Sequence, residues 1–293
     1  MSRSSNPSGG SQLRELLATN DIVAAPGIYD HMSLLLAEAA GHKALYASGY
    51  WGSASALGEA DVGIAGMSDF VSIFGRFAAR AKVPVIADAD TGFGSLTNLR
   101  RAVQLYSQAG IAAMQLEDQP FPKICGHVGR ATSVPVEQMV KRVAVAVEAR
   151  EDDDLMVIAR TDSRRSEGLE AAIDRLRAYS NAGADILFLE APETAEEIAT
   201  AASALDKPLM INAAHGGATP VLSPSEYAKL GVRLVIYPAG APLSALQGAA
   251  NFYAALANDD AIQSQDSMFK FSDISHLLGM DEIVAFQDRH GDA

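Results

Sequence analysis

The sequence predicts an α/β fold, a (β/α)8 barrel of the TIM type. Eight short apolar runs recur along the chain, and amphipathic stretches with helical spacing lie between them. Glycines follow two of these stretches, at Gly110 and Gly183, where helices commonly end. Eight strand and helix units suit a closed parallel barrel. The alternative is an open doubly wound sheet, but its glycine-rich dinucleotide turn is missing after the first run.

The expected elements follow one another in a regular order. The strands are expected at residues 22–25, 44–46, 83–87, 113–116, 156–159, 186–189, 209–211 and 234–236. Two of the helices between them are expected at 97–109 and 169–182. Residues 85–90 resemble 157–162, and residues 106–117 resemble 179–190, at nearly the same offset. A repeated pair of βα units supports a quasi-symmetric barrel.

The chain divides into a tail, a barrel and an extension. Residues 1–11 are rich in Ser, Gly, Pro and Asn without an apolar core, so a disordered tail is expected and not a signal peptide. The barrel is expected over 12–258. Residues 259–293 should form a helical extension whose apolar residues, Ile274, Leu277, Leu278, Ile283 and Val284, need a surface to bury against. An oligomer is therefore expected.

Composition excludes several classes of function. The 293 residues are 48% hydrophobic and 20% charged, which indicates a globular core and not a disordered chain. The formal net charge of −13 disfavours nucleic acid and anionic membranes as partners. The single cysteine, Cys125, cannot form an internal disulfide, so a reducing cytoplasm is expected. Small-molecule chemistry is the class that remains.

Polar residues cluster where the expected strands end, and three of them are carboxylates suited to a metal ion. Asp88 and Asp90 are two residues apart, which would point both to one face of a strand, and Glu117 ends the next strand. Oxygen ligands favour Mg²⁺, or Mn²⁺. Alternatively, these acids cap helices or pair with Arg160. Their joint occurrence favours the metal.

The segment Lys123-Ile124-Cys125-Gly126-His127 lies in a loop rich in Pro and Gly. The neighbouring Lys123 and His127 would favour a thiolate at Cys125, which could act as an acid or a nucleophile. A lone cysteine is more often an inert buried residue, but the loop setting favours the reactive alternative.

Two further residues are candidates for binding substrate. Arg160 ends the fifth expected strand and could hold a substrate carboxylate with two hydrogen bonds, or pair with Asp88 or Glu190 instead. His215 lies in a glycine-containing loop, where a histidine is more often a surface residue than a catalyst.

These motifs resemble the isocitrate lyase and phosphoenolpyruvate mutase superfamily over nearly the whole chain. The matching segments are Ser48-Gly49, D-A-D-x-G-F-G at 88–94, L-E-D-Q at 116–119, K-I-C-G-H at 123–127 and A-R-T-D at 159–162. The cysteine motif is similar to that of the lyase branch, whose members carry K-[KR]-C-G-H, and Ile124 departs from it. The mutase and phosphonopyruvate hydrolase branches lack this cysteine.

The resemblance implies a Mg²⁺-dependent lyase that cleaves a carbon-carbon bond beside a 2-hydroxy or 2-oxo carboxylate. It implies a homotetramer in which a helix from the C-terminal extension swaps between subunits. By position, Asp88 and Asp90 would hold the ion with Glu117 in its water shell, and Cys125 would be the general acid. The residues implied to line the substrate site, with the neighbours of these motifs, are Ser48, Gly49, Tyr50, Gly126, Arg160, Glu190, Asn212 and His215.

Departures from the resemblance narrow the expected substrate. Two arginines that methylisocitrate lyases place near 241–244 and 268–271 are missing here, where Leu243 and Lys270 stand. A third substrate carboxylate would be buried without its partner, which is costly. Tyr50 and Trp51 replace small residues and make the pocket more apolar. A substituted malate such as 2,3-dimethylmalate is therefore expected.

Other functions remain open at this point. Methylisocitrate cleavage, oxaloacetate hydrolysis or decarboxylation, and P–C bond chemistry are alternatives within the superfamily. A metal-dependent pyruvate aldolase would share the barrel and the carboxylates without needing Cys125. A non-catalytic relative would have lost the carboxylates that bind the metal. The presence of Asp88 and Asp90 disfavours this alternative.

Overall fold

A computed structural model describes residues 9–19, 21–123, 132–150, 154–260 and 268–291. Eight parallel strands close into a barrel in which each strand pairs with the next and β1 pairs with β8. The strands are β1 (Val23–Ile28), β2 (Leu45–Ala47), β3 (Val85–Asp88), β4 (Ala113–Glu117), β5 (Met156–Thr161), β6 (Ile186–Leu189), β7 (Leu209–Asn212) and β8 (Leu234–Tyr237). The predicted (β/α)8 fold is confirmed, and the open sheet is excluded.

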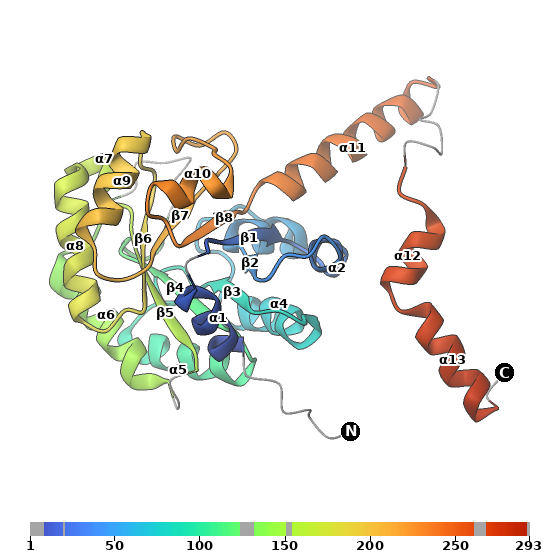
Figure 1. Cartoon of the computed structure of the whole chain (residues 1–293), viewed down its shortest axis with the longest axis horizontal. Helices are drawn as coiled ribbons and strands as arrows, with labels where there is room; N and C mark the ends of the chain where they lie inside the picture. Colours follow the sequence, from blue (N-terminus) through green and yellow to red (C-terminus); the bar gives the residue numbers. More distant parts are fainter. Residues whose placement is uncertain (1–8, 20, 124–131, 151–153, 261–267, 292–293) are drawn as a thin grey trace.

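Helices surround the barrel, as Figure 1 shows. They are α1 (Gly9–Ala18), α2 (His31–Ala39), α3 (Gly49–Gly52), the π-helical turn η1 (Ser53–Leu57), α4 (Met67–Arg80), α5 (Leu96–Gln108), α6 (Val136–Ala149), α7 (Arg164–Glu167), α8 (Leu169–Asn181), α9 (Ala195–Ala204), α10 (Pro224–Lys229), α11 (Gly240–Ala257), α12 (Phe271–Leu277) and α13 (Met280–His290). The helices expected at 97–109 and 169–182 are thus α5 and α8. Gly110 and Gly183 follow them with positive φ, as helix ends require.

Three strands that were read from the sequence as apolar runs end one residue later in the structure, on polar side chains. β3 ends on Asp88, β4 on Glu117, and β7 on Asn212. Parallel barrel strands are buried on both faces, so the apolar run marks the strand, while the polar terminal residues lie at its carboxyl end. These ends form the rim at which the site is built.

Helix α1 begins at Gly9, inside the segment expected to be a tail. The Ser11 backbone N–H donates to Asp154 Oδ1 over 2.8 Å, and Arg14 forms an ion pair of 3.0 Å with Asp185. Leu13 is fully buried in the same cluster as Ile86 and Ile158 from the barrel strands. These contacts attach the helix to the barrel, an attachment that composition alone did not reveal.

The C-terminal helices depart from the barrel. Figure 1 shows α11 running outward, with α12 and α13 beyond it, and α12 contacts the barrel through α2. Large apolar side chains are exposed on these helices: Leu246, Tyr253, Leu256, Phe271, Ile283, Val284 and Phe286. Within a single chain this apolar surface is therefore not covered.

Candidate active site

A cavity of about 220 Å³ opens at the carboxyl ends of the strands. Its polar lining includes Ser48, Asp61, Asp88, Glu117, Lys123, Arg160 and Asn212, and its apolar lining includes Trp51, Ile236, Pro238, Ala239 and Leu243. In a TIM barrel this end is where active sites are assembled. The structure therefore brings the predicted strand-end residues together at one site.

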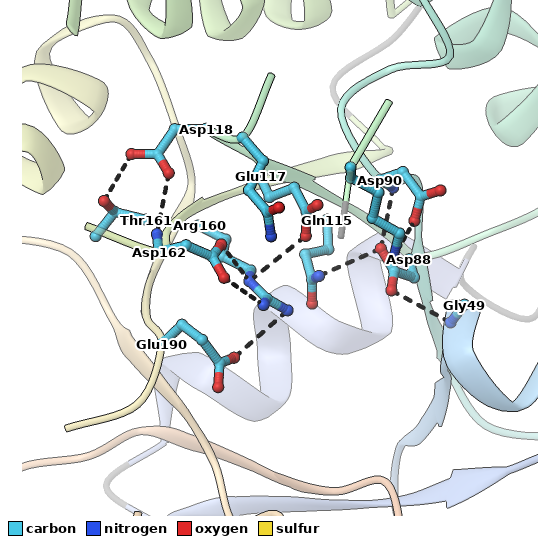
Figure 2. A network of polar contacts seen from close by, with 12 residues as sticks. Gly49, Asp88, Asp90, Gln115, Glu117, Asp118, Arg160, Thr161, Asp162 and Glu190 are labelled. Carbon is cyan, nitrogen blue, oxygen red and sulfur yellow. Dashed lines mark hydrogen bonds and ion pairs between the residues drawn. The ribbon is translucent and has the colours of Figure 1, made fainter. Parts of the chain in front are cut away.

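Asp88 is held by N–H donors on three sides (Figure 2). Its Oδ2 accepts from the Gly49 backbone N–H at 3.2 Å. Its Oδ1 accepts from the Asp90 backbone N–H at 3.0 Å and from Gln115 Nε2 at 3.3 Å. These three hydrogen bonds fix the orientation of the carboxyl group. Asp88 is therefore a pre-oriented carboxylate at the cavity wall.

Gly49 permits this close approach. A Cβ at position 49 would lie 2.9 Å from Asp88 Oδ2, closer than real Cβ atoms come to their neighbours. Any larger residue would displace the Asp88 carboxylate or the start of α3. Gly49 was expected to line the substrate site, and the structure shows its backbone in contact with the central carboxylate.

Asp90 does not continue the strand, because β3 ends at Asp88 and Asp90 has a φ of 48°. The period-two argument, which placed both acids on one face, therefore does not apply. Asp90 instead pairs with Lys123 Nζ at 2.7 Å, and Lys123 also contacts Asp61 at 2.8 Å. Burial raises the pKa of Asp90 to about 7, against the influence of Lys123. The surrounding carboxylates overcome burial and raise the pKa of Lys123 well above its ordinary value, so it stays charged.

Glu117 is 1% exposed, and its Oε1 has no hydrogen-bond partner among the described residues. Its Oε2 lies 3.6 Å from Arg160 Nε. Burial raises the pKa of Glu117 well above its ordinary value. A buried carboxylate oxygen without a donor is costly, and a bound cation or its water would satisfy it.

Arg160 is surrounded by carboxylates. Two of its nitrogens bind Asp162 at 2.7 and 2.9 Å, and its Nη1 lies 3.4 Å from Glu190. Its guanidinium also lies over the Phe188 ring, 5.1 Å from the centroid. The alternative of an ion pair with Glu190 is confirmed, whereas Asp88 is not its partner. Arg160 remains part of the cavity wall, so it can still face a substrate carboxylate.

Tyr50, Asn212 and His215 also line the cavity. Asn212 Nδ2 is within 3.4 and 3.5 Å of the Glu190 carboxylate oxygens, at the hydrogen-bond limit. Tyr50 packs edge-on against Trp51, with ring centroids 5.0 Å apart, and His215 is exposed at the rim. These aromatic groups narrow the entrance.

The described residues fit a divalent cation by charge and not as a preformed cage. Six buried carboxylates, Asp61, Asp88, Asp90, Glu117, Asp162 and Glu190, face two buried cations, Lys123 and Arg160, in the part of the site that the structure describes. No three His, Cys, Asp or Glu side chains in those residues are close enough to hold one ion. A cation such as Mg²⁺, which keeps several waters, suits this wide and acidic arrangement.

Three predicted residues, Cys125, Gly126 and His127, lie outside the described residues. Conversely, sequence reasoning missed Asp61, Tyr46 and Gln115. Asp61 was hidden in a loop without a motif. Tyr46 and Gln115 belong to strands that were read as apolar runs, and the alternation of polar and apolar residues in A-M-Q-L-E was the available signal for Gln115.

Comparisons with known proteins show the family of this chain. The family model described as phosphoenolpyruvate phosphomutase matches residues 13–257, and the chain belongs to this family. A 2,3-dimethylmalate lyase of Eubacterium barkeri is 41% identical over 273 residues, covering 93% of this chain and 94% of the relative. A 2-methylisocitrate lyase of Aeropyrum pernix is 42% identical over 229 residues, covering 78% of this chain and 73% of the relative.

A solved structure shows the same fold. Oxaloacetate acetylhydrolase in complex with 3,3-difluorooxalacetate superposes with a TM-score of 0.91 at 31% identity, and the match covers 97% of each chain. The resemblance to the superfamily is confirmed, and the relatives named as lyases confirm the prediction of a lyase-branch enzyme.

In the described residues, no helix is both long and apolar enough to cross a membrane.

Proposed function

We propose that this chain is a Mg²⁺-dependent carbon-carbon lyase that cleaves a substituted malate, such as 2,3-dimethylmalate, to pyruvate or a related oxo acid plus a carboxylate. The observation that supports it best is one cavity with a pre-oriented Asp88, an Arg160 and an apolar wall. The name of the relative that matches over more than nine-tenths of both chains agrees with this substrate.

Asp88, with Asp90 and Glu117 acting through water, would hold the cation, for which Mn²⁺ is a substitute. When bound, the cation supplies Lewis acidity for the negative charge that develops during cleavage. Asp88 would be its direct ligand, because its carboxylate lines the cavity and is already oriented. Oε1 of Glu117 has no hydrogen-bond partner in the described parts of the chain, which supports a place for Glu117 in the water shell.

The rest of the cavity would bind the two ends of the substrate. Arg160, with Asn212 and Glu190 beside it, would orient one carboxylate, and the Ser48-Gly49 backbone would contact the other. Trp51, Ile236 and Leu243 would pack against alkyl substituents. Tyr50 and His215 at the rim would limit the length of the substrate.

Cys125 would complete the reaction as the general acid. Water in the cavity would take up the hydroxyl proton of the substrate, the C2–O bond would become a carbonyl as the bond between C2 and C3 breaks, and the electron pair would remain on C3. The thiol then donates its proton to C3. Lys123, paired with Asp61 and Asp90, would anchor the start of this loop, and His127 and Gly126 would assist in binding.

A substrate panel with defined metal content tests the function. We expect cleavage of 2,3-dimethylmalate to exceed that of methylisocitrate, isocitrate, oxaloacetate and phosphonopyruvate, with loss after chelation and recovery with Mg²⁺. A preference for oxaloacetate would contradict the proposed lyase activity and indicate a hydrolase instead. Full activity in a chelated, metal-free sample would refute the proposed metal dependence.

The variant Cys125→Ser tests the general acid. Serine keeps the size of the side chain but raises its pKa far above the thiol's ~8.5, so turnover should fall about 10² to 10⁴-fold while ligand affinity is retained. Near-normal turnover would remove Cys125 from the mechanism.

The exposed apolar surface of α11 to α13 supports a homo-oligomer, and we propose a homotetramer with C-terminal helices exchanged between subunits, working in the cytoplasm. Size-exclusion chromatography with light scattering should give four chains per particle. A stable, active monomer at working concentration would contradict the assembly.

A further inference from the structure

Two buried polar side chains in the barrel interior have no role in the proposed chemistry. Tyr46 lies on β2 and Gln115 on β4, with β3 between them. Their exposed fractions are 2% and 0%. An amide at the centre of an apolar barrel is expensive to bury unless its hydrogen bonds are satisfied, so its partners indicate why it is there.

The partners form a chain that ends on the central carboxylate. The Tyr46 hydroxyl donates to Gln115 Oε1 over 2.8 Å, and Gln115 Nε2 donates to Asp88 Oδ1 over 3.3 Å. Gln115 and Asp88 are also direct neighbours in the register of β3 and β4. Figure 2 shows the Gln115 amide pointing to the Asp88 carboxylate.

The direction of this chain follows from Asp88. Asp88 Oδ1 is an acceptor, so the NH₂ end of Gln115 faces it and the carbonyl end faces Tyr46. Burial and the nearby Asp88 charge raise the pKa of Tyr46 well above its ordinary value, so the phenol keeps the proton that it donates to Gln115. The amide therefore presents a donor to the carboxylate before any ligand arrives.

We propose that Tyr46 and Gln115 form a positioning relay that orients the Asp88 carboxylate for a divalent cation. Gln115 and the Asp90 N–H both donate to Oδ1, whereas Oδ2 accepts only the Gly49 N–H among the described donors. The relay thus binds one oxygen from inside the barrel, and Oδ2 keeps the acceptor capacity that the Gly49 N–H does not use. This inference rests on the proposed metal dependence.

Cation affinity of the substrate-free protein tests the relay. Isothermal titration calorimetry with Mg²⁺ or Mn²⁺ should show affinity weakened about 10 to 100-fold in Gln115→Met, which keeps the length but lacks the donor. Tyr46→Phe should weaken it about threefold to tenfold, the value of one hydrogen bond. In the double variant Tyr46→Phe should have no further effect, because it acts through Gln115.

Tyr106→Phe is the matched control. Its hydroxyl is also buried and also donates to Asp88, over 2.7 Å, but to the backbone carbonyl and not to the carboxylate. This variant should lower the melting temperature and leave the cation Kd within about twofold, since the carboxylate keeps every donor. A general loss of packing would weaken cation binding in all three variants, and that result would overturn the relay.

The failures of the two proposals are distinguishable. A wild-type protein that binds no divalent cation refutes the proposed metal dependence and the relay with it. Cation binding by wild type that is matched by a folded Gln115→Met refutes the relay alone, as does additivity in the double variant. If Gln115→Met does not fold, Tyr46→Phe decides, and an unchanged Kd overturns the proposal.

Discussion

The two halves of the internal repeat give opposite charges to the same place in the barrel. V-I-A-D-A-D at 85–90 and V-I-A-R-T-D at 157–162 become β3 and β5, so Asp88 and Arg160 occupy corresponding strand ends. Each has a register partner on the next strand: Gln115 donates to Asp88, and Phe188 lies under Arg160. The side of the site proposed to bind the cation and the side proposed to bind a substrate carboxylate thus differ mainly at two corresponding positions, the strand-end residue and its register partner.

The corresponding glutamates of the repeat also differ: Glu117 ends β4, and Glu190 directly follows β6. Glu117 of the first half has an oxygen without a hydrogen-bond partner in the described structure, whereas Glu190 of the second half contacts Arg160 and Asn212. Arg160 lies near both glutamates, 3.6 Å from Glu117 Oε2 and 3.4 Å from Glu190 Oε2. The difference is therefore the second oxygen of Glu117, which a cation or its water would satisfy. Corresponding elements of the repeat give side chains corresponding positions, and the remaining local partners set their chemistry.

The largest effect on turnover is expected for Asp88→Asn, at the strand end of the first half of the repeat. The uncharged amide is a weak ligand for a hard cation, and its NH₂ group would meet N–H donors that now point to a carboxylate. Turnover with Mg²⁺ should fall by more than the roughly 100-fold expected for an indirect partner of a metal. Kinetics and metal titration check this.

The exposed carboxylate of Asp174, paired with Arg177 at 2.9 Å on α8, provides the control for this charge loss. Asp174→Asn should leave turnover unchanged. A turnover of Asp88→Asn within threefold of wild type would remove the distinction between the two sides of the repeat.

Substitutions of Arg160, at the strand end of the second half of the repeat, should mainly change stability and substrate affinity. Arg160→Gln leaves Asp162 and Glu190 without their cation, and breaking such buried pairs costs about 3–5 kcal/mol of unfolding free energy. Arg160→Lys keeps the charge but loses the two-pronged contact, so KM should rise about 10 to 100-fold. Denaturant unfolding and steady-state kinetics measure the two effects. An unchanged KM in Arg160→Lys would exclude Arg160 from substrate binding.

The smallest expected effect is a difference in unfolding free energy between variants of the corresponding tyrosines of the repeat. Tyr106 donates to the backbone carbonyl of Asp88, and Tyr179 donates to the carboxylate of Asp118 at 2.9 Å. Hydrogen bonds to charged groups are the stronger class, so Tyr179→Phe should cost about 1.5–3 kcal/mol and Tyr106→Phe about 0.5–1.5 kcal/mol. Equal losses of unfolding free energy would show that the acceptor's charge does not matter here.

Much of the barrel was predictable, because buried parallel strands appear in sequence as apolar runs of the right length. The run at 186–189 coincides with β6, and the polar residue that follows each of the third to seventh runs marks the rim. The site was predictable only as a set of strand ends. Asp90 shows the limit: its positive φ turns it to Lys123, and no strand period could foresee that turn.

The amino-acid sequence by itself determined the barrel, the excess of acidic residues at its rim and the cysteine motif of the lyase branch, since these depend on local pattern and composition. Only the tertiary structure shows which distant partner each polar side chain has: Lys123 with Asp61, Arg160 with Glu190, and Gln115 with Asp88. Lys123 and Asp61 are 62 positions apart, and Gln115 and Asp88 are 27 apart, so only closure of the barrel brings them within hydrogen-bonding range.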